Sequence, residues 1–282
     1  MDSVCIMIPT YNQSGCINKA VDSALLQDYP NLKIIIADDH SSDDTERVLQ
    51  PYLWHSKIQY IKNKKNCGRV ANYRRLLYEL TDADWVINLD GDDYYTNNSF
   101  ISEAMKAIHN AGSNKVLFYQ GAHLIRFNGI EKMMPSDVNT DELILSGEAY
   151  FLNYFHNKHF SHMSTLYNRK LAVACGFYQK DILSADIFSV LQLCVGNKNL
   201  LAILSRQISG IWVMHKNNRS KTMNIAAHAK NLNCIIKLCI QAMNAGFNKS
   251  GCRKWKKIAI RSYSISYLNS VIKKVGNIFS FN

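Results

Sequence analysis

The stretch VINLDGDDYYT, residues 86–96, ends an apolar run with three acidic residues around one glycine. Carboxylates spaced as Asp-x-Asp in a tight glycine turn can converge on one hard cation such as Mg²⁺ or Mn²⁺. A cation held in this way usually completes its shell with water and substrate phosphates. Asp and Gly are also favoured in solvated turns, so this stretch alone leaves a metal site and an ordinary turn both open.

Two earlier apolar runs also end in polar residues, VCIMIPTYN (residues 4–12) and LKIIIADDHSSDDT (residues 32–45). Residues 15–28 between them carry apolar side chains at helical spacing, and residues 69–80 are expected to form another helix. This alternation predicts an α/β fold, with a mostly parallel sheet and flanking helices on both faces. Because ligands bind beyond the carboxyl ends of the strands in such sheets, the three polar strand ends predict one shared site.

In this order and spacing, IPTYN, ADDHSSDDT and LDGDD resemble the signatures of the family 2 glycosyltransferases, I-P-x-Y-N, V-D-D-G-S-x-D-x-T and L-D-x-D-D. The resemblance is specific over about the first hundred residues and continues weakly to Thr222. It implies a GT-A (Rossmann-like) fold. It also implies transfer of a sugar from a nucleotide diphosphate sugar, UDP before other nucleotides, with inversion at the anomeric carbon.

The resemblance also assigns a nucleotide site to the strand ends and to the loop before residue 70. Its implied members are Pro9, Tyr11, Asn12, Asp39, Lys65, Arg69, Asp90 and Gly91. Tyr11 would stack on the base, and Asp39 would accept a hydrogen bond from it. His40 stands where the family usually has glycine, which permits backbone angles that histidine resists.

For the metal, Mn²⁺ or Mg²⁺, the resemblance implies Asp92 as a direct ligand and His215 as a further contact. The segment GFYQKDILSADIFSVLQL (residues 176–193) resembles the part of the family that carries the catalytic base, which places the base at Asp186. Ala185 replaces the first acid of that motif, and the usual helix arginine is missing. Asp181 is therefore a competing candidate for the base.

Residues 150–167 are rich in aromatic side chains and histidine. They are expected either to line an acceptor groove, because aromatic faces pack on sugar rings, or to form ordinary core and loop. His162 and Ser164 are the expected acceptor contacts. Residues 133–161 as a whole are expected to combine a loop with a helical stretch.

We expect residues 1–222 to form the GT-A catalytic domain, with a nucleotide-binding half (1–115) and an acceptor-binding half (116–222). Residues 223–282 are expected to form a helical C-terminal extension. The net charge is +11, and residues 253–274 hold seven Lys or Arg and no acid. Their aromatic and apolar neighbours predict a basic amphipathic tail on an anionic membrane surface. The alternative is a helix that packs back on the domain with a solvated basic face.

The eight cysteines form no CxxC pair, so their spacing predicts no zinc site, and all eight are expected to be buried thiols.

With no signal peptide or bilayer-length apolar run, the sequence predicts a cytoplasmic protein, either free or peripheral on the inner face of the plasma membrane. Its expected acceptor is a saccharide, free or lipid-linked, in surface polysaccharide synthesis. A basic nucleic-acid-binding protein is a rival, but no such motif is present and the acid clusters would repel phosphate. A nucleotidyltransferase lacks support because PTYNQSGC is not a basic glycine-rich loop. A processive membrane polymerase is disfavoured because QISGIW departs from Q-x-x-R-W. A catalytically inactive nucleotide-binding relative stays open because of Ala185.

Overall fold

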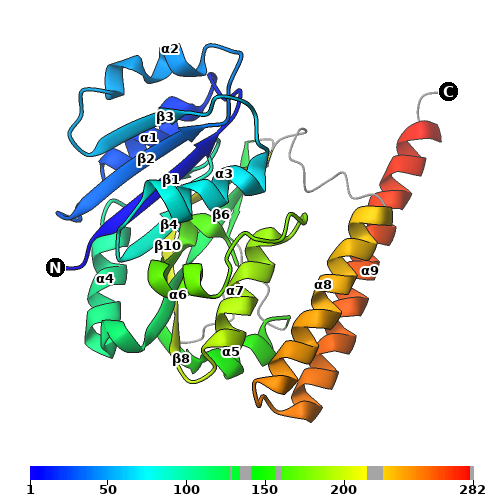
Figure 1. Cartoon of the computed structure of the whole chain (residues 1–282). Coiled ribbons are helices and arrows are strands. Elements are labelled where there is room, and N and C mark those ends of the chain that lie inside the picture. Colours follow the sequence, from blue (N-terminus) through cyan, green and yellow to red (C-terminus); the bar gives the residue numbers. More distant parts are fainter. Residues whose placement is uncertain (128, 134–140, 156–159, 215–224, 280–282) are drawn as a thin grey trace.

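A computed structural model of the protein describes residues 1–127, 129–133, 141–155, 160–214 and 225–279 (Figure 1). One sheet has the strand order β3-β2-β1-β4-β9-β6-β10-β5, and β7 and β8 pair with β6 and β10. The strands are β1 (Val4–Thr10), β2 (Leu32–Asp38), β3 (Ile58–Lys62), β4 (Trp85–Asn88), β5 (Tyr94–Tyr95), β6 (Val116–Phe127), β7 (Ile130–Met133), β8 (Glu142–Ser146), β9 (Thr165–Asn168) and β10 (Leu201–Met214). The α-helices are α1 (Ile17–Leu25), α2 (Thr45–Leu49), α3 (Arg69–Arg75), α4 (Phe100–Ala111), α5 (Gly147–Asn153), α6 (Arg169–Ala174), α7 (Ala185–Gly196), α8 (Ile225–Asn244) and α9 (Lys249–Phe279). Short turns of helix include η2 (Leu76–Leu80) and η4 (His162–Ser164).

The sheet is mixed, with a parallel majority. Strands β1 to β4 are parallel to one another, and β9 is antiparallel to both β4 and β6. Strand β10 is parallel to β6, so both run in the direction of β1. The predicted α/β fold with flanking helices is therefore confirmed. The expectation of a loop and a helical stretch over residues 133–161 does not include a strand, but residues 142–146 pair with β10 as the antiparallel strand β8.

Strand β1 is buried along its whole length because helices cover both faces of the sheet (Figure 1). Its side chains alternate between two cores, as the period of a strand requires. Ile6 and Ile8 pack in the core under α1 and α4, whereas Cys5 and Met7 pack in the core that includes residues of α3, α5 and α7. This central position fixes the strand end at Pro9 and Thr10, where the site begins.

The C-terminal helices α8 and α9 lie side by side and pack on the rest of the molecule (Figure 1). Trp255 of α9 is 1% exposed, and its ring stacks on that of Phe151 in α5 with centroids 4.3 Å apart. Cys252 and Ala259 are buried on the same side of α9. The first half of α9 thus follows the alternative in which the tail packs back on the domain.

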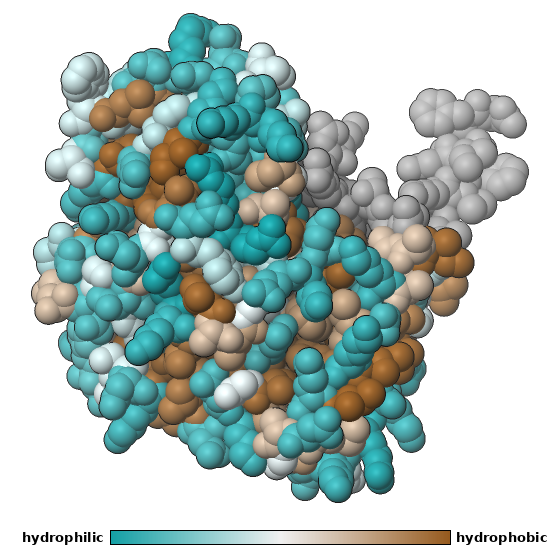
Figure 2. Space-filling model, in the orientation of Figure 1, coloured by the Kyte–Doolittle hydropathy of each residue, from teal (hydrophilic) through white to brown (hydrophobic). Residues whose placement is uncertain are grey.

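Because of this packing, α8 and α9 share a hydrophobic core with the sheet. The predicted boundary between residues 222 and 223 falls in 215–224, outside the described residues, and stays a prediction. Figure 2 shows hydrophilic and hydrophobic side chains interleaved on the face over α8 and α9. Within the described ranges, no helix is both long and apolar enough to cross a bilayer. All eight cysteines are free thiols. Cys5, Cys194, Cys234, Cys239 and Cys252 are buried, as expected, but Cys16 and Cys175 are half-buried and Cys67 is exposed, so the expectation is wrong for these three.

Candidate active site

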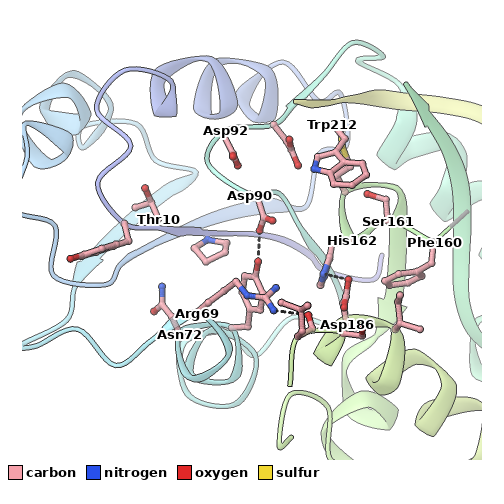
Figure 3. A pocket seen from close by; sticks show the side chains of 18 of the residues that line it. Thr10, Arg69, Asn72, Asp90, Asp92, Phe160, Ser161, His162, Asp186 and Trp212 are labelled. Carbon is pink, nitrogen blue, oxygen red and sulfur yellow. Dashed lines mark hydrogen bonds and ion pairs between the residues drawn. The ribbon is translucent and has the colours of Figure 1, made fainter. Parts of the chain in front are cut away.

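A cavity of about 810 Å³ lies at the carboxyl ends of β1, β2 and β4 (Figure 3). Its volume is in the range of sites that hold small molecules or cofactors, roughly 300–1,000 Å³. Pro9 lies near the end of β1, Asp39 follows β2 and Asp90 follows β4, and all three line the cavity. The three polar strand ends therefore meet in one place, as the strand–helix alternation predicts.

The acidic turn after β4 brings three carboxylates together. One oxygen from each of Asp90, Asp92 and Asp93 lies within 4.8 Å of the others. Burial raises the pKa of Asp93 well above its ordinary value, and Asp92 and Asp90 add to the rise. Burial also raises the pKa of Asp90, with a further contribution from Asp92. Carboxylates that oppose one another's ionisation in this way fit a hard divalent cation, whose charge would offset the repulsion.

A side chain at Gly91, at the centre of this turn, would have to displace the ends of two neighbouring side chains. A Cβ atom here would lie 2.4 Å from Oε1 of Gln13 and 2.8 Å from Cδ1 of Ile17. Thr10 donates to the same Gln13 oxygen at 2.8 Å. The acidic turn therefore packs directly on the start of α1, which fixes its position relative to β1.

Hydrogen bonds from the protein hold Asp90 and Asp93 in place. The Tyr73 hydroxyl of α3 donates to Oδ1 of Asp90 at 2.6 Å. The backbone N–H of Val213, near the end of β10, donates to Oδ1 of Asp93 at 2.8 Å. The acidic turn is thus tied to one element on each side of the cavity.

The loops after β1 and β2 hold each other. The backbone N–H of Asn12 donates to Oγ of Ser41 at 2.9 Å, and the Asn12 side-chain oxygen accepts from the N–H of Ser42 at 2.9 Å. His40 has φ 67°, the left-handed conformation that glycine adopts most easily. Its Nδ1 lies 3.0 Å from the Asn63 carbonyl oxygen. Histidine therefore keeps the backbone shape of the glycine that the family usually has at this place.

Asp39 holds the loop that leads into α3. Its Oδ1 accepts from the Cys67 N–H and the Asn63 amide, both at 2.8 Å, and its Oδ2 accepts from the Gly68 N–H at 2.8 Å. Burial opposes its ionisation, but these donors outweigh burial and hold the pKa of Asp39 below its ordinary value. Asp39 is therefore an anion that orders the cavity edge.

Asp186 lies in the first turn of α7 and faces the cavity (Figure 3). Its Oδ2 is 3.0 Å from Nε2 of His162. The other ring nitrogen of His162, Nδ1, is 3.1 Å from the Tyr178 hydroxyl and 3.2 Å from Nδ2 of Asn88. Burial opposes the ionisation of Asp186, yet His162 and then Arg69 outweigh it and hold the pKa of Asp186 below its ordinary value. The site therefore keeps an ionised carboxylate in a buried position.

Arg69, at the start of α3, lies between the two acidic groups (Figure 3). Its guanidinium donates to the Leu183 carbonyl at 3.0 Å and lies 5.5 Å from the centre of the Tyr73 ring. Although burial opposes its charge, Tyr73, Asp186 and Asp90 raise the pKa of Arg69. Arg69 thus links the acidic turn to the loop that precedes Asp186.

Most of the residues implicated by the sequence line the cavity. They are Pro9, Tyr11, Asn12, Asp39, Arg69, Asp90, Asp92, His162 and Asp186. Lys65, Gly91 and Ser164 do not line it. Lys65 is exposed, and Ser164 is fully buried with its hydroxyl donating to the Ser161 carbonyl at 3.2 Å. The competing acid Asp181 is exposed and also lies outside the cavity lining, and His215 is outside the described residues.

Sequence reasoning missed several lining residues, which include Asn72, Tyr73, Trp212, Ser262 and Tyr263. Tyr154, Phe155 and Phe160 also line the cavity, and they belong to residues 150–167, for which an acceptor groove is one of the two expectations. Tyr73 could have been found, because it follows Arg69 by four residues and so shares a helix face with it. Trp212 and Tyr263 come from elements far apart in the chain, and no local pattern marks them.

The family model described as "Glycosyl transferase family 2" matches residues 5–175. The chain belongs to this family. WfaP of Escherichia coli, described as a "UDP-Glc:alpha-D-GlcNAc-diphosphoundecaprenol beta-1,3-glucosyltransferase", is 35% identical over 118 residues, 42% of this chain and 45% of WfaP. An uncharacterised glycosyltransferase of Mycoplasma genitalium is 40% identical over 99 residues, 34% of this chain and 33% of the relative. The chain thus spans less than half the length of these curated relatives.

Solved structures establish the GT-A fold of this family 2 member. The S. aureus TarS fragment 1–349, in complex with UDP-GlcNAc, matches with a TM-score of 0.77 at 16% identity, over 95% of this chain and 74% of that chain. A mannosyltransferase of Pyrobaculum calidifontis, in complex with GDP-Man and Mn²⁺, matches with a TM-score of 0.63 at 13% identity, over 100% of this chain and 81% of that chain. At this level of identity the likeness concerns the fold alone.

Proposed function

We propose that the protein is an inverting glycosyltransferase that moves a sugar from a UDP-sugar to a hydroxyl group of a saccharide acceptor. One observation carries the proposal: Asp186 and the Asp90–Asp92–Asp93 cluster line the same cavity, with Arg69 between them (Figure 3). The names of WfaP and of the TarS complex support UDP as the nucleotide. The WfaP name also supports a lipid-linked saccharide acceptor and a role in surface polysaccharide assembly.

The nucleotide would lie between the loops after β1 and β2. Tyr11 lines the cavity and is 42% exposed, so its ring can stack on a base. Oδ2 of Asp39 accepts a hydrogen bond from the Gly68 N–H, and its second lone pair can accept another from the base. Arg69 and Asp90 lie further in, where the diphosphate and ribose would sit. Lys65 and Gly91 would act from outside the cavity lining, through charge and through the shape of the turn.

Asp92, together with Asp90 and Asp93, would hold a divalent cation, Mn²⁺ or Mg²⁺. When bound, such an ion supplies Lewis-acid chemistry by neutralising charge on the departing diphosphate. The crowding of the three carboxylates supports this assignment, since hard oxygen ligands suit these ions. His215, two residues after Val213, remains a predicted further ligand.

Asp186 would act as the general base. Its carboxylate would take the proton from the acceptor hydroxyl while that oxygen bonds to the anomeric carbon and the bond to the diphosphate breaks. Attack from the face opposite the diphosphate inverts this carbon, and no carboxylate nucleophile is required. His162 would orient Asp186, and the expected acceptor contact at Ser164 would act only indirectly, since Ser164 is fully buried. The ionised carboxylate at Asp186 argues against an inactive relative despite Ala185.

The exposed cations Arg253, Lys254, Lys257 and Arg261 on α9 support peripheral contact with the anionic inner face of the plasma membrane, and hence a cytoplasmic enzyme. Trp255 is buried and would take no part. Flotation with vesicles containing phosphatidylglycerol tests this contact. Binding that disappears in Lys254→Glu/Lys257→Glu is expected, and equal flotation of the two proteins would contradict it.

The function is tested by the melting temperature with UDP-glucose, UDP-GlcNAc and GDP-mannose, with and without Mn²⁺. The stabilisation by a ligand increases with the ratio of its concentration to its dissociation constant. If Mn²⁺ tightens binding, a UDP-sugar should raise the melting temperature more when Mn²⁺ is present. Asp92→Asn should lose the Mn²⁺-dependent part, and Asp186→Asn should keep binding but lose transfer. Asp82→Asn, an exposed acid outside the cavity, is the control. If Mn²⁺ does not change the binding of UDP-sugars, the proposed metal site is wrong. If Asp186→Asn keeps full transfer activity, Asp186 is not the general base.

A further inference from the structure

The cavity has a second, aromatic end beyond Asp186. Tyr154 and Phe155 follow α5, Phe160 precedes η4, and Tyr263 comes from α9. Figure 3 shows Phe160 beyond His162 and Asp186, on the side away from Thr10 and Asn72. Among the described residues that line it, this end holds no acidic cluster, so its chemistry differs from that of the end that faces the three carboxylates.

Helix α9 is held firmly where it reaches this end. Trp255 stacks on Phe151, and the Phe155 ring lies 5.2 Å from the Trp255 ring and 6.3 Å from the Tyr263 ring. Two turns along α9 from Trp255, Ser262 and Tyr263 line the cavity. The family model ends at residue 175, so this part of the cavity wall lies outside the matched region.

Tyr263 also lies close to the group that would act as base. Burial, Asp186 and Cys234 raise the pKa of Tyr263 to about 12, although Ser184 at the N-cap of α7 opposes the rise. The phenol therefore stays protonated at neutral pH and keeps a hydrogen-bond donor beside the aromatic rings. A wall that combines aromatic faces with one hydroxyl suits a sugar ring, which offers C–H faces and hydroxyl groups.

We propose that α9 supplies the acceptor-binding wall of the cavity. Tyr263 and Ser262 would contact the acceptor sugar unit, whose hydroxyl group receives the transferred sugar. This inference rests on the proposed function and names a site for its second substrate. It makes the C-terminal helices part of the catalytic unit. The donor end is lined by residues before 94 and by Trp212, none of which belongs to α9.

Tyr267 provides a matched control on the same helix. It lies one turn beyond Tyr263, its ring stacks on that of His228 at 4.8 Å, and it does not line the cavity. Loss of helix packing alone would therefore affect Tyr267→Ala as well as Tyr263→Ala. Tyr263→Phe keeps the ring and removes only the hydroxyl, so it tests the same contact if the alanine variant is poorly folded.

The test screens methyl hexosides and methyl N-acetylhexosaminides against the full chain with UDP and Mn²⁺, by saturation-transfer difference NMR, and measures the UDP dissociation constant in parallel. We expect at least one glycoside to bind, with affinity reduced on the order of tenfold in Tyr263→Ala and less in Tyr263→Phe. UDP affinity should stay within about twofold in both, and Tyr267→Ala should match the unmodified protein in both measurements.

An unchanged glycoside affinity in Tyr263→Ala would overturn the proposal that α9 forms the acceptor-binding wall. A screen in which no glycoside binds the unmodified protein would also overturn it. Absence of UDP binding would instead overturn the proposed function, so the two failures are distinguishable. A second arm compares the binding glycoside with one that carries a diphosphate–alkyl group. Tighter binding of the latter supports a lipid-linked source, and equal binding supports a free saccharide.

Discussion

Nε2 of His162 lies 3.0 Å from Oδ2 of Asp186, which joins η4 to the first turn of α7 inside the cavity. Both side chains are largely shielded, with 12% and 23% of their surfaces exposed. The contact joins the residue expected to meet the acceptor to the residue expected to act as base. It gives His162 a positioning role that the sequence does not indicate.

His162→Gln should shift the acidic limb of the pH–rate profile to higher pH. Asp186 must be ionised to take a proton, and its pKa is held below the ordinary 3.8 by His162 and Arg69 against burial. Without the imidazole, burial prevails and the pKa of Asp186 rises, so activity at low pH is lost first. Since a positioned base contributes roughly 10²–10⁴-fold, we also expect at least about a tenfold fall in kcat.

The control for this variant is His109→Gln, which removes a histidine 3.3 Å from Asp2 at the surface. It should leave the profile unchanged. An acidic limb in His162→Gln that coincides with that of the unmodified enzyme would show that His162 does not act through Asp186.

Tyr73→Phe should impair the acidic turn without unfolding the protein. The hydroxyl that it removes donates to Asp90 at 2.6 Å. Hydrogen bonds to charged groups contribute about 1.5–3 kcal/mol, so we expect kcat/KM to fall roughly 10- to 100-fold. Tyr52→Phe, which removes a comparable bond to Asp22 at the surface, is the control. Equal activity of the two variants would contradict the role given to Tyr73.

Gly91→Ala should reduce both stability and Mn²⁺-dependent binding of UDP. Its methyl group would displace Gln13 and press on Ile17, and such overpacking costs roughly 1–3 kcal/mol. Gly15→Ala is a matched control, because a Cβ atom there meets nothing within 4 Å. Calorimetric titration and urea unfolding measure the two effects. A Gly91→Ala protein that resembles Gly15→Ala in both would show that the turn tolerates a side chain.

Trp255→Ala should lower the free energy of unfolding by about 3–5 kcal/mol, the usual cost of deleting a buried aromatic side chain. Trp255 is 1% exposed, whereas Trp54 is 93% exposed, so Trp54→Ala should change stability little. Urea unfolding followed by circular dichroism compares them. Similar midpoints for the two variants would mean that α9 does not pack on α5 in solution.

The sequence by itself determined the parallel strands β1 to β4 and the end of the cavity at their carboxyl ends. Strand alternation and the polar residues that follow Ile8, Ala37 and Leu89 are local features, and parallel strands carry their carboxyl ends to one edge. The resemblance to the family added Asp186, which does line the cavity. It could not show that His40 would adopt the left-handed backbone of a glycine.

Only the tertiary structure decided the other end. Phe155, His162 and Tyr263 belong to segments whose patterns are equally typical of core, loop or a membrane-facing helix. Their roles follow from the packing of α9 on α5 through Trp255, and from the approach of His162 to Asp186. Contacts between distant segments depend on how whole elements dock, and the spacing of residues within one segment does not encode that docking.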